Sequence, residues 1–221
     1  MLSENLLHIL EFVGTISFAI SGALVAIRAQ LDIFGVIFIG GITAVGGGIV
    51  RDLLIGRIPP SIFSNGQIML IAILASVLVF LIAYFNRQKF EELSAKIESI
   101  NNVFDAVGLA TFTVMGTEVS FLFGFSDNIF LTVVLGMLTG VGGGIFRDIL
   151  TDTTPYIFKK HIYALASIFG SLLYYFLRRY TETLILATVL SLVFVVVIRM
   201  LATKYLWSLP KIRFEETDKQ S

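Results

Sequence analysis

The sequence predicts an all-α integral membrane protein with seven transmembrane helices, arranged as two inverted three-helix repeats plus a C-terminal seventh helix. Three observations predict this class. Of the 221 residues, 56% are hydrophobic and only 14% are charged, whereas charged residues make up about 25% of a typical soluble domain. Seven apolar runs are long enough to cross a bilayer, and one segment of residues 45–54 recurs almost unchanged at 141–150.

The apolar runs define the expected helices. A bilayer core about 30 Å thick needs about 20 apolar residues in helical form. Such runs lie at residues 8–27, 33–56, 64–85, 102–123, 129–150, 161–177 and 183–206. Short polar connections separate them. We expect a first repeat, a second inverted repeat, a seventh helix and a polar cytoplasmic tail, in residues 1–100, 101–180, 181–207 and 208–221.

The distribution of basic residues predicts the orientation, because cytoplasmic loops are enriched in Lys and Arg. The loops after spans 1, 3, 5 and 7 contain Arg28, Arg87, Lys89, Lys96, Lys159, Lys160, Lys204, Lys211, Arg213 and Lys219. The loops on the opposite side contain only Arg57, Arg178 and Arg179. We therefore expect a multi-pass protein of the cell inner membrane with its N-terminus outside and its C-terminus in the cytoplasm.

The composition argues against several function classes. Lys plus Arg equals Asp plus Glu, at 16 each, so the net charge offers no attraction for nucleic acid. The chain has no cysteine, and its two histidines lie outside any metal-ligand pattern. No Ser/His or Cys/His arrangement near the glycine segments suggests a catalytic site. We expect neither an enzyme nor a protein with a metal or cofactor.

The internal repeat extends over two successive helices. Beside the ten-residue match, the helix that precedes each copy also matches, with Glu11 opposite Asp105. A unit of three spans is odd, so its second copy enters the membrane from the other side. Inverted repeats place the solute path near the bilayer midplane, at the interface between the repeats.

Each copy contains three consecutive glycines in the middle of an expected helix, at a cost of roughly 1 kcal/mol each relative to alanine. One explanation is close helix packing. The other is a kink or unwound turn whose backbone lines a water-filled path. The doubled triplet, followed each time by Arg, favours a functional kink with packing as a contributor. The candidate residues are Gly46, Gly47, Gly48, Gly142, Gly143 and Gly144.

Charged residues within the spans are the other candidates for the path. An intramembrane arginine costs at least roughly 2.5–3.5 kcal/mol at a helix centre, so it is expected to face water or a counter-charge. Adjacent helical residues do not face one another. We therefore expect no ion pair between Arg51 and Asp52, and none between Arg147 and Asp148. Two sets of partners are left open. One is the aspartate of the other repeat, which is Asp148 for Arg51 and Asp52 for Arg147. The other is the pair of acids in the first helix of each repeat, Glu11 and Asp105. The alternative is that the arginines form buried ion pairs with a purely structural role. Glu118 is a further acid that we expect to line the pore.

The two three-helix repeats, each with GGG-x-x-RD in its second helix, and the lone seventh helix resemble the prokaryotic trimeric intracellular cation channel (TRIC) family. The resemblance extends to about Tyr205. It implies a homotrimer in membrane lipid with one pore per protomer, helices kinked at the glycines, and permeation by monovalent cations, K+ foremost and Na+ as well. On the matching positions it nominates Arg51, Asp52, Arg147 and Asp148 as polar groups at the pore.

Two points remain open from the sequence. Unpaired arginines repel a cation, so we interpret them as paired structural or gating elements, with selectivity set by carboxylates and carbonyls. Inverted repeats with broken helices are equally typical of secondary transporters. A transporter for a small polar solute such as an amino acid is therefore the alternative function.

Overall fold

The computed structural model describes residues 2–64, 66–159, 162–181 and 183–207, and these are all-helical apart from their connections. Seven helices in these ranges have 19 residues or more: α1 (Leu2–Arg28), α2 (Ile33–Leu54), α3 (Gly66–Phe85), α5 (Ser94–Leu122), α6 (Ile129–Leu150), α8 (Ile162–Tyr180) and α9 (Leu184–Lys204). The short helices are η1 (Ser61–Phe63), α4 (Arg87–Glu92) and α7 (Tyr156–Lys159). The expected tail of residues 208–221 lies outside the described residues.

Five of the long helices are apolar and long enough to cross a membrane: α1, α2, α3, α6 and α9. The other two, α5 and α8, carry more polar residues, and some of these are buried where the two helices pack together. Thr113 and Ser167 hydroxyls lie 2.6 Å apart, and one turn further Thr117 and Ser171 do the same. Two helices of low hydropathy are thus joined by paired hydroxyl groups within the bundle.

The helices that carry the glycine triplets begin in the same way. The Asp32 carboxylate accepts a hydrogen bond from the backbone N–H of Gly35 (2.8 Å), which caps α2. The Asn128 side chain accepts one from the N–H of Leu131 (3.0 Å), which caps α6. Such side chains satisfy N–H groups that have no partner within the helix. Both helices are 22 residues long.

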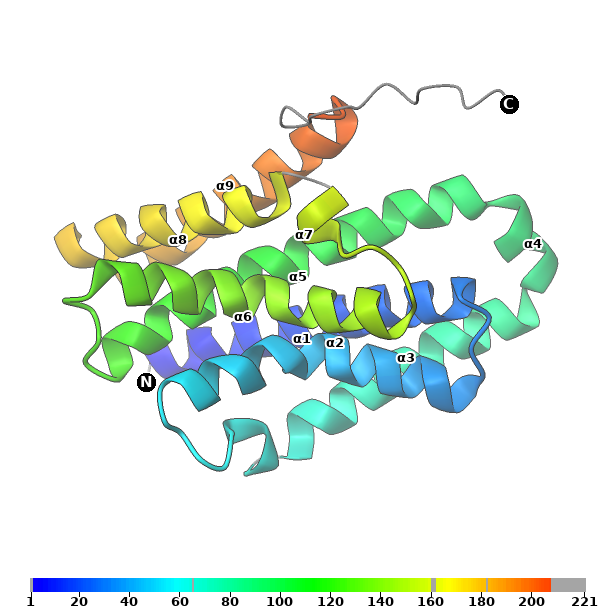
Figure 1. Cartoon of the computed structure of the whole chain (residues 1–221), viewed down its shortest axis with the longest axis horizontal. Coiled ribbons are helices and arrows are strands. Elements are labelled where there is room, and N and C mark those ends of the chain that lie inside the picture. The colour runs from blue at the N-terminus through cyan, green and yellow to red at the C-terminus, as the bar shows by residue number, and fades with distance from the viewer. Residues whose placement is uncertain (1, 65, 160–161, 182, 208–221) are drawn as a thin grey trace, which may run out of the picture.

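The chain forms two packed groups of helices (Figure 1). The first consists of α1, α2 and α3, and the second of α5, α6 and α8. The groups meet where α1 packs against α5 and α2 against α6, while α9 covers α8 and α5. In Figure 1, α5 runs opposite to α1, and α6 runs opposite to α2.

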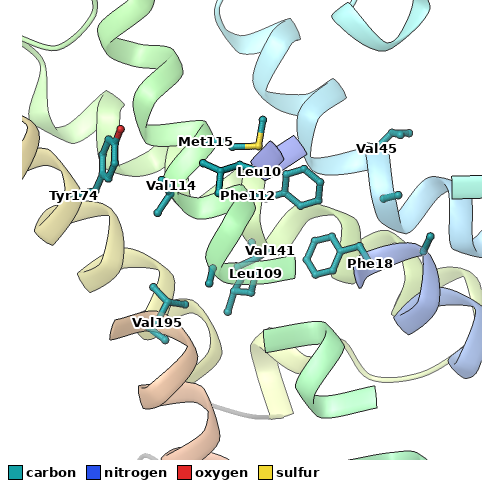
Figure 2. Close-up of a cluster of buried hydrophobic side chains, with 14 of the residues drawn as sticks. Leu10, Phe18, Val45, Leu109, Phe112, Val114, Met115, Val141, Tyr174 and Val195 are labelled. Carbon is teal, nitrogen blue, oxygen red and sulfur yellow. The ribbon is translucent and has the colours of Figure 1, made fainter. Parts of the chain in front are cut away.

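Aromatic rings and glycines interlock at the α1–α5 contact. The rings of Phe18 and Phe112 have centroids 5.3 Å apart (Figure 2). The Phe112 ring occupies the space that a methyl group at Gly14 would need. In the same way, the Phe18 ring occupies the space that a methyl group at Gly108 would need. This reciprocal packing lies in the apolar core, beside Leu10, Leu109 and Val141. Glu11 and Asp105 lie about one turn before Gly14 and Gly108, and therefore close to the contact between the two groups.

Candidate functional site

The glycine triplets form the contact between α2 and α6. Both helices are helical throughout, so neither is unwound at the glycines, and a kink within a continuous helix stays a prediction. A methyl group at Gly47 would overlap the backbone carbonyl oxygen of Thr139, and one at Gly143 would overlap that of Thr43. Backbones approach this closely only where neither helix carries a side chain. Close packing therefore explains the middle glycine of each triplet.

The outer glycines have different neighbours. Gly46 packs against the ring of Phe146, which would lie 2.7 Å from an added methyl, and Gly142 faces Gly47. The third glycines leave space for the arginines: the nearest atom to a methyl at Gly48 would be Nη2 of Arg51, at 3.7 Å. At Gly144 an added methyl would lie 3.0 Å from the Tyr163 hydroxyl. The last glycine of each triplet thus borders a charged cluster.

Each arginine pairs with the aspartate next to it, contrary to the expectation from helix geometry. Nε of Arg51 donates to Oδ1 of Asp52 (2.9 Å), and Nη2 lies 2.7 Å from the same oxygen. Nε of Arg147 donates to Oδ1 of Asp148 (2.8 Å). The expectation failed because the long arginine side chain can curl back along the helix surface to its neighbour. Neither expected cross-repeat pair occurs among the ion pairs of the described ranges.

The second oxygen of each aspartate binds the segment after the helix. Oδ2 of Asp52 accepts from the backbone N–H and hydroxyl of Ser61 (2.8 and 2.6 Å), at the start of η1. Oδ2 of Asp148 accepts from the N–H of Tyr156 (2.8 Å), at the start of α7. Each Arg-Asp pair therefore fastens the end of a glycine-bearing helix to the short helix that follows it.

The second-repeat cluster is completely buried. Nη1 of Arg147 donates to Oδ1 of Asp105 and to the Ser21 hydroxyl, both at 2.7 Å. The pair with Asp105 is one of the two that the sequence left open. Arg199 of α9 approaches from the other side, with Nη2 3.8 Å from Oδ2 of Asp105 and its guanidinium 4.6 Å above the Tyr163 ring. Two arginines thus neutralise Asp105.

The first-repeat cluster differs from this. Glu11, the counterpart of Asp105, forms no ion pair with Arg51 in the part of the chain that the structure describes. Its carboxylate lies 3.9 Å from Nδ1 of His8, and 35% of its side chain is exposed. Glu11 lines a cavity of about 40 Å³ together with Thr15, Arg51 and Asp52. The second repeat therefore contains a buried cluster of ion pairs, whereas the first repeat contains an acid, Glu11, beside a cavity.

The chain has full-length relatives among bacterial membrane proteins. The family model described as "Glycine transporter" matches it at residues 8–84 and 102–179. The UPF0126 inner membrane protein YadS of Escherichia coli (strain K12) is 34% identical over 215 residues, covering 96% of this chain and 98% of the relative. A UPF0126 membrane protein of Deinococcus radiodurans is 38% identical over 168 residues, covering 75% of this chain and 73% of the relative.

The fold matches solved channel structures. A prokaryotic TRIC channel crystallised in 0.5 M KCl superposes with a TM-score of 0.82 at 32% identity, covering 93% of this chain and all of that one. The chain belongs to the prokaryotic TRIC family. The TRIC trimeric intracellular cation channel orthologue from Rhodobacter sphaeroides is similar too, with a TM-score of 0.81 at 28% identity over 91% of this chain and 99% of that one.

Sequence reasoning missed several residues of the clusters in this TRIC-family chain. Arg199 had a signal, because an arginine inside a predicted span marks a functional position. It has no counterpart in the repeat, so the repeat comparison did not bring it near Asp105. The Tyr163 phenol donates to Asp105, and nothing in the sequence distinguishes Tyr163 from other polar residues of the spans. Ser21, which accepts from Arg147, is one of several hydroxyl residues of the first helix that could line a polar pore, but the sequence does not indicate its partner.

Glu118, expected to line the pore, forms a separate pair in this TRIC-family fold. Its carboxylate accepts from the Tyr174 hydroxyl (3.0 Å) and from Nε of Arg178 (3.1 Å), both on α8. The Glu118 side chain is buried, whereas that of Arg178 is one-third exposed. The pair therefore closes the α5–α8 contact near the end of α8.

Two neighbouring arginines allow a matched test of this pair. We expect Arg178→Ala to lower the free energy of unfolding by about 1–3 kcal/mol, because it leaves the buried Glu118 carboxylate without its cation. Arg179→Ala should change it by less than about 1 kcal/mol, because Arg179 pairs with the exposed Asp127 (3.1 Å). Denaturation of both purified variants measures the difference, and equal losses would contradict the assignment.

Proposed function

We propose that this chain is a channel for monovalent cations, K+ foremost and Na+ as well, and that it assembles as a homotrimer with one pore in each protomer. The observation that carries the proposal is the full-length similarity to a prokaryotic TRIC channel, at a TM-score of 0.82 and 32% identity. The Rhodobacter sphaeroides orthologue, described as a trimeric channel, supports the assembly. The solved structures matched at these identities are channels and not enzymes.

The proposed path runs between two inverted three-helix repeats, at the glycine segments of α2 and α6. Several features support the repeats. The family model matches twice, at 8–84 and 102–179. The corresponding helices α1 and α5 run in opposite directions, as do α2 and α6 (Figure 1). In this proposal all seven long helices cross the membrane, with α9 as the lone seventh.

The charges at this interface suit cations better than anions. Arg51 is neutralised by Asp52, and Arg147 by Asp105 and Asp148. A paired arginine projects little field into a path, whereas the partly exposed Glu11 has no arginine partner among the described residues. We propose the Arg-Asp pairs as gating elements, because each one ties a pore helix to the short helix after it.

We also propose that the chain lies in the inner membrane with its N-terminus outside and its C-terminus in the cytoplasm. The bias of Lys and Arg between the loops supports this orientation. A reporter fused after Ser221 should therefore be active on the cytoplasmic side, and one fused before Met1 on the external side. Activity of both fusions on the same side would require an even number of crossings and exclude the inverted repeat.

The name of the family model keeps a second function open, a secondary transporter for glycine or a similar small solute. Flux through proteoliposomes separates the two. A channel should release a K+ gradient rapidly in vesicles that contain purified protein, with no saturable uptake of labelled glycine. Saturable, gradient-driven glycine uptake without K+ release would replace the channel by the transporter. Empty vesicles provide the control for leakage.

A further inference from the structure

We propose that the cavity beside Glu11 binds a single monovalent cation, held by the Glu11 carboxylate and the Thr15 hydroxyl. The proposal rests on the proposed function, because it locates an ion-binding position on the conduction path. Glu11 and Thr15 are four residues apart in α1, which places them on the same face of the helix. Both line the cavity of about 40 Å³ that α1 and α2 form together with residues of η1, α3 and α5.

The Thr15 hydroxyl is the unusual group in this cavity. Threonines in membrane helices usually donate to the carbonyl four residues earlier, and Thr43, Thr111, Thr117 and Thr139 all do so here. Thr15 is fully buried, and its Oγ1 has no hydrogen-bond partner in the described chain. A buried polar atom without a partner is costly, so a ligand that supplies one is favoured at this position.

The charge of the cavity selects a monovalent cation. Arg51 directs two nitrogens at Oδ1 of Asp52, and the other Asp52 oxygen accepts two hydrogen bonds from Ser61. These two residues neutralise each other, so Glu11 supplies the net charge of the lining. Divalent cations prefer several carboxylates or a rigid octahedral shell, and one carboxylate with a hydroxyl does not provide these.

The size of the cavity fits this assignment. A water molecule needs about 10–15 Å³ measured in the same way, so about 40 Å³ accommodates a dehydrated or partly hydrated ion. Water molecules complete its oxygen shell. One-third of the Glu11 side chain is exposed on the surface of the protomer, so the site is not sealed within it.

The described part of the second repeat, residues 101–159 and 162–180, forms no equivalent site. Asp105 is held by Arg147 at 2.7 Å and faces Arg199 at 3.8 Å, so its charge is already compensated. The residue that corresponds to Thr15 is Leu109, a buried part of the apolar core. The asymmetry predicts one such cation per protomer, bound in the first repeat.

Thermal unfolding of the purified full-length protein in detergent tests the site without requiring conduction. A KCl titration at constant ionic strength, balanced with N-methyl-D-glucamine chloride, should raise the Tm in a saturable way, because the folded state alone binds the ion. Glu11→Gln and Thr15→Val should weaken the apparent K+ affinity at least tenfold. The control Glu91→Gln removes an exposed acid elsewhere, on α4, and should keep the wild-type titration.

Each result supports or overturns the site. A wild-type Tm that does not depend on K+ overturns it, as does an unchanged K+ titration in both variants. Thr15→Val that only raises the Tm, with unaltered K+ dependence, would mean that the hydroxyl is merely an unsatisfied group. K+ currents without K+-dependent stabilisation would leave the channel standing and remove the site. Stabilisation lost in both variants, in a protein that passes no current, would leave the site standing and remove the channel.

Discussion

Replacing Arg147 with alanine is expected to lower the free energy of unfolding by about 3–5 kcal/mol, the range measured when one partner of a buried ion pair is removed. Arg147 has no exposed surface and holds Asp105, Asp148 and Ser21 at 2.7–2.8 Å. Its removal leaves Asp105 with Arg199, at 3.8 Å, as its one remaining cation among the described residues, beside the Tyr163 hydroxyl at 3.4 Å. A loss of this size should appear in a denaturant titration and as weaker assembly in mild detergent.

Two comparisons show whether the uncompensated charge causes the loss. Arg51→Ala, the counterpart in the first repeat, should cost less, because Asp52 retains both hydrogen bonds from Ser61 near the cavity. Adding Asp105→Asn to Arg147→Ala should recover part of the stability, since it removes the buried charge. An Arg147→Ala protein as stable as the wild type would show that the cluster is hydrated and not sealed.

Replacing Gly47 or Gly143 with alanine is expected to separate α2 from α6. Overpacking typically costs about 1–3 kcal/mol, and here the new methyl meets a backbone carbonyl, of Thr139 or Thr43, that cannot rotate away. We expect each single variant to lie at or above the upper end of this range and the double variant to fail to assemble. Size-exclusion chromatography and thermal unfolding measure both effects.

Gly48→Ala is the matched control for folding within the same triplet. Its methyl would have Arg51 Nη2 as nearest atom, at 3.7 Å, and alanine favours the helix by about 1 kcal/mol. The folded fraction and the Tm should therefore equal or exceed those of the wild type. If Gly47→Ala and Gly143→Ala fold and assemble normally while conduction is lost, the glycines act through helix bending, and close packing is the wrong explanation.

The positions of the helices could be predicted well where hydropathy alone decides them. The expected runs at 33–56 and 129–150 correspond to Ile33–Leu54 and Ile129–Leu150. The run at 102–123 was too short, since α5 begins at Ser94. Its first turns contain Lys96 and Glu98, and Arg28 at the end of α1 lies 3.9 Å from Glu98. A hydropathy pattern does not detect a polar helical extension stabilised by a contact with another helix.

The charged residues of the site were predictable, but their pairing was not. An Arg or Asp within a span stands out in any membrane sequence, which brought Arg51, Arg147 and Asp105 forward. Pairing depends on side-chain conformation and on which helix covers which face. Arg147 reaches Asp148 by curling along its own helix, and Arg199 reaches Asp105 only because α9 packs on α5. Asp105 has an arginine from α9 beside it and Glu11 does not, because α9 packs on α5 in the second repeat.

Recording from the purified protein in a planar bilayer under a KCl gradient tests cation conduction most directly. We expect discrete unitary current steps with a reversal potential displaced toward the K+ equilibrium potential. These steps should disappear with Gly47→Ala/Gly143→Ala protein. Current that reverses toward the Cl− equilibrium potential, or an absence of unitary steps from folded, assembled wild-type protein, would contradict cation conduction by this chain.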